Sequence, residues 1–169
     1  MSITLHTSIK IQFQYPTSWV QSEKISSHDR GPDISVSKGG SGSVFWITLE
    51  NDTRIGSNLQ AGLRHVMKML NESNAQNGYE ITQPPSFATI DGQMAETFTS
   101  YSRHGFGAEK LEIIEQYWLT YGESADYYFV GFIAPIQSFD NPENIMVRNQ
   151  FISSIKILDA AELAKFEAD

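Results

Sequence analysis

Hydrophobic and polar residues alternate near the start of the chain, which predicts a strand with one buried side. The apolar residues of segment 9–15, all on one face of such a strand, are Ile9, Ile11, Phe13 and Tyr15. Pro16 cannot donate a backbone hydrogen bond to a neighbouring strand, so the strand is expected to end there. The turn that follows allows Trp19 to fold back over the end of the strand.

Two later segments carry apolar side chains at both odd and even positions. These are "VFWITL" at 44–49 and "DYYFVGFIA" at 126–134. A strand that is apolar on both faces is typical of the centre of a sheet that is covered on both sides. The pair Asp91–Gly92, between two alternating segments, predicts a tight hairpin turn.

Two segments have the spacing of amphipathic helices. Residues 57–73 carry an apolar stripe at helical intervals, and residues 138–155 form the second segment. In the second segment Asn141 is a suitable N-cap and Pro142 suits the first helical position. The residues expected to face the sheet there are Val147, Phe151 and Ile155.

The order of these elements predicts an α+β fold. We expect an antiparallel sheet of about six to eight strands flanked by helices on both faces, an α/β/α sandwich. Residues 1–158 would form a single domain, and residues 159–169 a short C-terminal helical tail. Asp159 and Glu162 have the spacing of a capping box at the start of that tail.

Composition narrows the classes of partner. The 169 residues carry a net charge of −8, from 12 basic and 20 acidic side chains. This charge disfavours free nucleic acid and acidic membrane surfaces as partners, because both need clustered cations. There is no cysteine, and no apolar run approaches the ~20 residues of a membrane span. The N-terminus does not resemble a signal peptide, which leaves two locations open: the cytosol, or export with a signal absent from this chain.

No combination of residues in the sequence meets the requirements of a catalytic site, and no cofactor is expected. The histidines show no metal-ligand spacing, and the glycine-rich segment 38–43 lacks the order of a phosphate-binding loop. The carboxylates in or beside the strand expected at 110–121 are not paired either, because Glu112 falls on the opposite face from Glu115 and Glu109. The loop from His28 to Asp33 carries possible oxygen ligands, and whether it holds a metal ion is left open.

Aromatic residues are the most distinctive part of the composition, with 10 Phe, 7 Tyr and 3 Trp. Most are expected in the core, but Tyr and Trp also anchor interfaces. Trp118, Tyr121 and Tyr128 are the predicted partner-binding or ligand-binding residues, on one less regularly apolar face of the sheet.

Several short patterns in the chain, taken in order, resemble the PsbP-like superfamily. The first strand ends in "YPTSW", at Tyr15, Pro16 and Trp19, and "FATIDGQMAETFTSY" follows the first helix. That second pattern resembles the hairpin of the superfamily at Gly92 and Ala95, and "FISSIKI" at 151–157 is similar to its terminal segment except at Ile155. The resemblance covers about residues 5–158.

The resemblance implies a function in binding rather than catalysis. The superfamily includes accessory proteins of photosystem II, a Ran-binding transport factor, DcrB-like lipoproteins and chaperones of secreted effectors. The resemblance implies that this chain is a non-catalytic accessory protein. It would engage another macromolecule, expected to be a protein, through its sheet face and loops. The alternative is a small-ligand or lipid-binding domain with an aromatic pocket under the first helix. A weak homodimer is left open.

Overall fold

The computed structural model describes most of the chain. The described residues are 2–6, 9–23, 31–51, 61–62, 64–65, 67–69, 72, 80–104, 111–122 and 126–167. Of the possible metal ligands in the loop from His28 to Asp33, His28 and Asp29 lie outside these residues. The Asp33 carboxylate accepts a hydrogen bond from the Leu49 amide at 2.8 Å.

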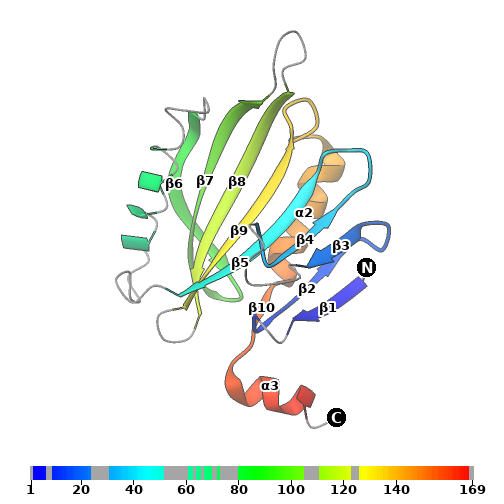
Figure 1. The fold of residues 1–169 in the computed structure, drawn as a ribbon, viewed down its shortest axis with the longest axis vertical. Helices are drawn as coiled ribbons and strands as arrows, with labels where there is room; N and C mark the ends of the chain where they lie inside the picture. The colour runs from blue at the N-terminus through cyan, green and yellow to red at the C-terminus, as the bar shows by residue number, and fades with distance from the viewer. Residues whose placement is uncertain are drawn as a thin grey trace.

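The centre of the molecule is a seven-stranded sheet in which all neighbouring strands are antiparallel (Figure 1). This confirms the predicted α+β class and the expected number of strands. In spatial order the strands are β3 (Val20–Glu23), β4 (Ile34–Ser37), β5 (Val44–Asn51), β9 (Asp126–Pro135), β8 (Leu111–Tyr121), β7 (Gln93–His104) and β6 (Glu80–Ile90).

The sheet is not a simple meander, because β5 pairs with β9 and not with β6. The two strands that are apolar on both faces, β5 and β9, thereby lie next to each other inside the sheet. Strand β6 contains Pro84 and Pro85 and is mostly exposed. Proline is tolerated at the edge of a sheet, which is where β6 lies.

The N-terminal strand belongs to a separate sheet of three strands. Its order is β1 (Ser2–His6), β2 (Ile11–Tyr15) and β10 (Lys156–Ile157), all antiparallel. Hydrogen bonds fix this sheet to its surroundings. They include Gln14 N–H to Ser154 Oγ at 2.8 Å, Leu158 N–H to the Lys10 carbonyl at 2.9 Å, and the Tyr128 hydroxyl to the Ile9 carbonyl. The small sheet therefore closes the core at the C-terminal end of the second helix.

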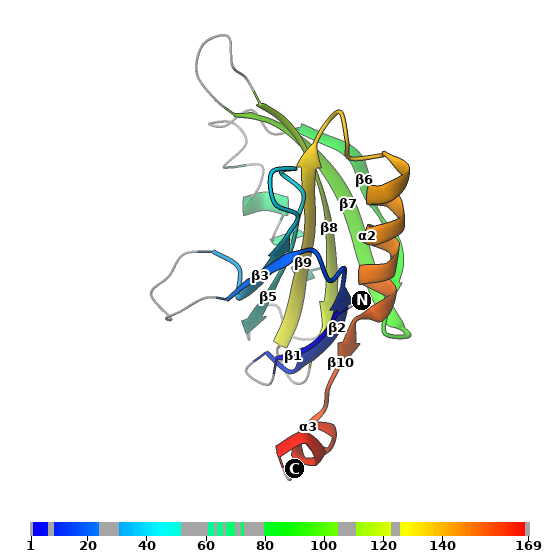
Figure 2. The same cartoon turned by 90° about the vertical axis from the view of Figure 1, so that its right-hand side faces the viewer.

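Helix α2 (Pro142–Ser154) begins as the sequence predicts. The Asn141 side chain accepts the Asn144 amide at 2.7 Å, and Pro142 opens the first turn. Val147, Phe151 and Ile155 are buried on one side of the sheet, where Phe151 stacks on Phe45 at 3.9 Å. Figure 2 shows α2 along that side. We call this side the α2 face.

The opposite side, which we call the aromatic face, has its own core. Its buried members are Phe98, Tyr117, Leu119 and Tyr127, and Trp46, Tyr121, Phe129 and Met67 pack against them. Met67 belongs to the helix expected over 57–73, and the described residues between 61 and 72 are helical. The rest of that helix lies outside the described residues, so a helix along the whole aromatic face remains a prediction.

A short helix, α3 (Ala160–Glu167), follows the small sheet and extends away from it (Figures 1 and 2). The predicted capping box is present: Glu162 N–H donates to Asp159 Oδ1 at 2.7 Å, and Asp159 N–H donates to Glu162 Oε2 at 3.2 Å. Within the described part of the chain, no helix is long and apolar enough to cross a membrane.

Candidate functional site

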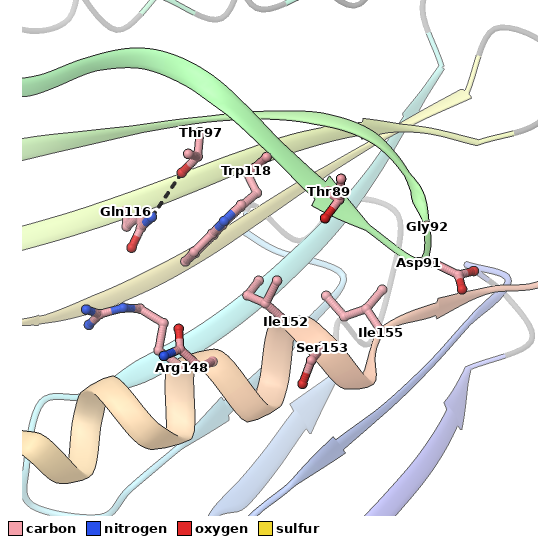
Figure 3. A pocket seen from close by; sticks show the side chains of 12 residues that line it. Thr89, Asp91, Gly92, Thr97, Gln116, Trp118, Arg148, Ile152, Ser153 and Ile155 are labelled. Atoms are coloured by element: carbon pink, nitrogen blue, oxygen red, sulfur yellow. Dashed lines mark hydrogen bonds between the residues drawn. The ribbon is translucent and has the colours of Figure 1, made fainter.

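A groove runs between α2 and the strands β6, β7 and β8 on the α2 face. It consists of two cavities, of about 700 Å³ and 310 Å³, and both are lined by Gln116 and Arg148. Figure 3 shows the larger cavity, with the helix on one side and the strands on the other. We call the two cavities together the α2 groove. Their sizes are within the usual range of ligand sites, about 300–1,000 Å³.

The floor of the α2 groove is set by the two-residue period of β8. Ile114, Gln116 and Trp118 point to the same face, because side chains two apart on a strand share a side. Ile114 lines the smaller cavity, Trp118 lines the larger cavity, and Gln116 lies between them and lines both. The floor is therefore apolar at each end and polar in the middle.

Gln116 is held in a fixed orientation by its neighbour on β7. Its Nε2 donates to Thr97 Oγ1 at 3.0 Å, and Thr97 Oγ1 donates to the Tyr117 carbonyl at 2.8 Å. Figure 3 shows the amide nitrogen of Gln116 turned to Thr97 and its oxygen turned toward α2. The side chain thus presents a hydrogen-bond acceptor to the groove.

Arg148 forms the helix side of the same junction. Its Nη1 donates to the Phe139 carbonyl at 2.9 Å and its Nη2 to Asp140 Oδ1 at 3.3 Å. The guanidinium also lies over the Phe139 ring, 4.3 Å from the centroid. Burial lowers the pKa of Arg148, and the Asp140 carboxylate opposes this effect. The group remains a cation, since the ordinary arginine pKa is far above neutral.

Asp91 lies at the other end of the groove, in the turn between β6 and β7. The turn has the predicted hairpin form, with positive φ at Asp91 (51°) and Gly92 (72°). The Asp91 carboxylate accepts the Ile157 amide at 2.9 Å and so ties the hairpin to β10. Asp91 in the hairpin turn and Arg148 in the middle of α2 therefore both have partners within the chain.

The three predicted site residues do not share one face. Trp118 (5% exposed) and Tyr128 (1% exposed) point to the α2 face, and Tyr121 points to the aromatic face. The expectation of one shared face was wrong. Tyr121 is three residues from Trp118 on β8, so their side chains point to opposite sides of the sheet, whereas Tyr128 is paired with Thr120 and lies on the same side as Trp118. Of the three, Trp118 lines the α2 groove, and the Tyr128 hydroxyl is directed to the Ile9 and Lys10 carbonyls. Their role in binding stays a prediction.

Gln116 and Arg148 were not predicted, although the sequence contains a signal for each. Gln116 interrupts an apolar set of same-face positions between Ile114 and Trp118. Arg148 is spaced four residues from both Asn144 and Ile152, so these three side chains lie along one line of α2. That line is next to the one formed by the sheet-facing residues Val147, Phe151 and Ile155. In both cases the signal is a polar or charged residue among apolar residues that share one face of a strand or helix.

The carboxylates of β8 lie on opposite faces, as predicted. Glu112, on the α2 face, accepts hydrogen bonds from the Tyr101 hydroxyl at 2.6 Å and from Arg103 at 3.0 Å, and these lower its pKa. Glu115, on the aromatic face, has a pKa raised by burial, against opposing hydrogen bonds from Tyr117 and Trp46. The aromatic side chains of Tyr117 and Trp46 beside Glu115 reduce its contact with water. The described residues, which do not include His28 and Asp29, contain no group of three or more potential metal ligands.

The aromatic face is packed by ring contacts. Tyr117 stacks on Phe98 at 4.7 Å and on Phe129 at 5.2 Å, and Trp46 meets Phe129 edge-on at 4.9 Å. Two buried polar atoms on β7, Glu96 Oε2 and Ser100 Oγ, have no hydrogen-bond partner among the described residues. Such atoms are uncommon in folded proteins and need an explanation.

Comparisons with known proteins support the fold. No family model and no curated protein matches the sequence. Among solved structures, the cyanobacterial PsbP protein CyanoP from Synechocystis sp. PCC 6803 matches with a TM-score of 0.62 at 15% identity, over 92% of this chain and 91% of that chain. LpqN of Mycobacterium tuberculosis, described as involved in cell envelope biogenesis, matches with a TM-score of 0.54 at 12% identity, over 94% and 90%.

A third structure, from Bacteroides thetaiotaomicron VPI-5482, matches with a TM-score of 0.56 at 16% identity, over 95% of this chain and 49% of that chain. At these identities the likeness is one of fold. It confirms the resemblance drawn from the sequence at that level: the chain has a PsbP-like fold.

Proposed function

We propose that this chain is a non-catalytic binding protein that engages another polypeptide through the α2 groove. The observation that carries the proposal is the pair of cavities joined at Gln116 and Arg148 along one side of α2. Gln116 presents an acceptor there and Arg148 a cation, within a wall that also contains Trp118. This combination of an aromatic anchor and placed polar groups is typical of binding sites.

The chemistry of the groove supports binding over catalysis. Its titratable side chains are Asp91, Asp140 and Arg148. Asp91 is bonded to a backbone amide, and Asp140 and Arg148 are bonded to each other. A general acid or base needs access to a substrate proton, and each of these groups is already engaged in a hydrogen bond or ion pair within the chain.

The fold supports the same proposal at a coarser level. The chain shares its architecture with CyanoP, a PsbP protein, and with LpqN, a protein of cell envelope biogenesis. These neighbours suggest an accessory or binding protein and leave the partner undefined. The partner must therefore be found by experiment on this chain.

Site-specific photo-crosslinking tests the proposal. A photoreactive phenylalanine analogue is placed at Ser153, which lines the groove, or at Gln150, an exposed residue of the same helix outside the lining. Cells expressing each variant are irradiated, and the adducts are identified by mass spectrometry. We expect a defined protein adduct at Ser153 and a much weaker one at Gln150. Equal labelling at both positions, or no protein adduct at Ser153, would refute the proposal.

A second candidate function rests on the aromatic face. Within the part of the chain that the structure describes, the hydroxyl of Ser100, a residue 2% exposed, has no hydrogen-bond partner, and neither does the buried Glu96 Oε2. A small polar ligand held among the rings of this face would supply the missing hydrogen bonds. Native mass spectrometry of freshly purified protein tests this candidate: a retained ligand that is lost on Ser100→Ala supports it, and a bare chain mass excludes it.

A further inference from the structure

The spacing of the residues along β8 defines the ligand geometry of the α2 groove. Ile114 and Trp118 are four residues apart on one strand, which corresponds to about 13 Å at the rise of a β-strand. The two apolar ends of the groove floor are therefore separated by the same distance as side chains i and i+4 of a second extended chain lying parallel to β8.

Each end of the groove has apolar walls besides its floor residue. In the larger cavity Trp118 is joined by Ile152 and Ile155 of the helix region. In the smaller cavity Ile114 is joined by Ile136 and Phe139. Each cavity thus has three large apolar side chains in its lining, beside polar ones. Trp118, Ile155 and Phe139 are at most 6% exposed, so the surface offered to an apolar side chain of a ligand comes mainly from Ile152 in the larger cavity and from Ile114 and Ile136 in the smaller one.

The junction between the cavities suits a peptide backbone or a polar side chain. The Gln116 oxygen is an acceptor for an N–H group, and the Arg148 guanidinium is a donor for a carbonyl. Both groups are oriented by bonds within the chain, Gln116 by Thr97 and Arg148 by the Phe139 carbonyl. Groups fixed before binding lose little freedom when the ligand arrives.

A peptide bound there cannot extend the sheet. Strand β8 is paired with β7 on one side and with β9 on the other, so its backbone groups are already used. Recognition must come from side chains of the floor and of α2. This differs from strand addition at a sheet edge, and it makes the spacing of apolar side chains the main determinant of specificity.

The charges favour basic residues at the two ends of such a peptide. Asp91 lines the larger cavity and Asp140 lines the smaller one, and the Asp140 side chain is 79% exposed. The whole chain carries a charge of −8. Flanking lysine or arginine residues would therefore be attracted, and acidic ones repelled.

We propose that the α2 groove binds an extended polypeptide segment with two apolar side chains at positions i and i+4, a polar residue at i+2 facing Gln116 and Arg148, and basic flanks. This inference rests on the proposed function and specifies the class of peptide that the groove recognises.

Selection from a random nine-residue peptide display library on the full chain tests the inference. Counter-selection uses Ser153→Trp, which places a large ring in the larger cavity, and Gln150→Trp serves as the matched control on the exposed side of α2. We expect a consensus of two apolar positions separated by three residues. Binding of the selected peptides should weaken at least about tenfold in Ser153→Trp and in Gln116→Leu, and change less than about twofold in Gln150→Trp.

Thr89→Trp, which narrows the same cavity from the β6 side, replaces Ser153→Trp if that variant does not fold. Three results would overturn the inference: no enrichment over the counter-selection variant, a consensus with another apolar spacing, or displacement of the peptides by neutral hexasaccharides such as maltohexaose and cellohexaose. If the crosslink at Ser153 persists while the consensus fails, the proposed function stands and only the peptide class is wrong.

Discussion

At the scale of single residues, Glu115 and Glu112 show how position on one strand decides the behaviour of a carboxylate. The aromatic rings around Glu115 remove water from it, and burial raises its pKa above the ordinary value of 4.5. Three residues earlier and on the other face, bonds from Tyr101 and Arg103 lower the pKa of Glu112. The two groups should therefore affect stability in opposite directions.

We predict that Glu115→Gln stabilises the protein at neutral pH. The folded chain binds the Glu115 proton more tightly than the unfolded chain does. Wild-type stability therefore falls as pH rises from the ordinary carboxyl pKa through the raised one. Glutamine cannot ionise but can still accept the bonds from Tyr117 and Trp46. Urea unfolding at several pH values should show that the variant gains most above the raised pKa and little at acidic pH.

Glu112→Gln is the matched control for this prediction. The lowered pKa of Glu112 contributes stability above the ordinary carboxyl pKa, and that contribution is lost as pH falls through the lowered value. The variant should therefore be less stable than the wild type at neutral pH, with the difference shrinking in acid. The same sign of change in both variants at neutral pH would contradict this account.

Tyr128 supports the fold through its hydroxyl, which donates to the carbonyls of Ile9 and Lys10. We predict that Tyr128→Phe lowers the free energy of unfolding by about 1–3 kcal/mol, because buried carbonyls lose a donor. Tyr15→Phe is the control, since no hydrogen bond from the Tyr15 hydroxyl is present among the described residues, and it should change the value by less than about 0.5 kcal/mol. Equal losses in thermal or urea unfolding would refute the role of the Tyr128 bond.

At the scale of elements, the contact between β5 and β9 depends on a missing side chain. Gly131 pairs with Trp46 across the two strands, and a Cβ at Gly131 would overlap the indole ring. Trp46 therefore lies close against the backbone of β9 at Gly131 and reaches Phe129 and Tyr117. The glycine in a central strand is explained by this close approach.

We predict that Gly131→Ala destabilises the protein by about 1–3 kcal/mol or more, because the indole must move within a packed cluster. The double variant Gly131→Ala with Trp46→Leu should lose less than the sum of the two single variants, since leucine leaves room for the methyl group. Calorimetry or urea unfolding of the four proteins gives the coupling. Additive losses would mean that the ring and the glycine are independent.

Most of the elements follow from local patterns in the sequence. Alternation predicts β2, and apolar residues on both faces predict β5 and β9 as central strands. The Asp91–Gly92 pair predicts the β6–β7 hairpin, and Asn141 with Pro142 predicts the start of α2. The pairing of β5 with β9 and the separate sheet of β1, β2 and β10 do not follow. Both depend on which distant segments meet, and side-chain periodicity gives the faces of a strand but not its neighbours.

At the scale of the whole molecule, the α2 groove arises because a single helix covers only part of one sheet face. Trp118 was predicted as a site residue and lines the groove, but Gln116 and Arg148 come together from segments 32 residues apart. Their junction depends on how α2 lies against β8, and no local pattern contains that information. The sequence could therefore identify a single residue of the site, Trp118, but not the groove that it lines.

The most direct test of the central claim, that the α2 groove is the binding surface, is hydrogen–deuterium exchange of the chain with and without the partner captured at Ser153. We predict slower exchange of backbone amides in α2, in the β6–β7 hairpin and in β8 from Ile114 to Trp118, with the strands β3 and β4 unchanged. Protection confined to segments outside the groove, such as β3 and β4, would contradict the account.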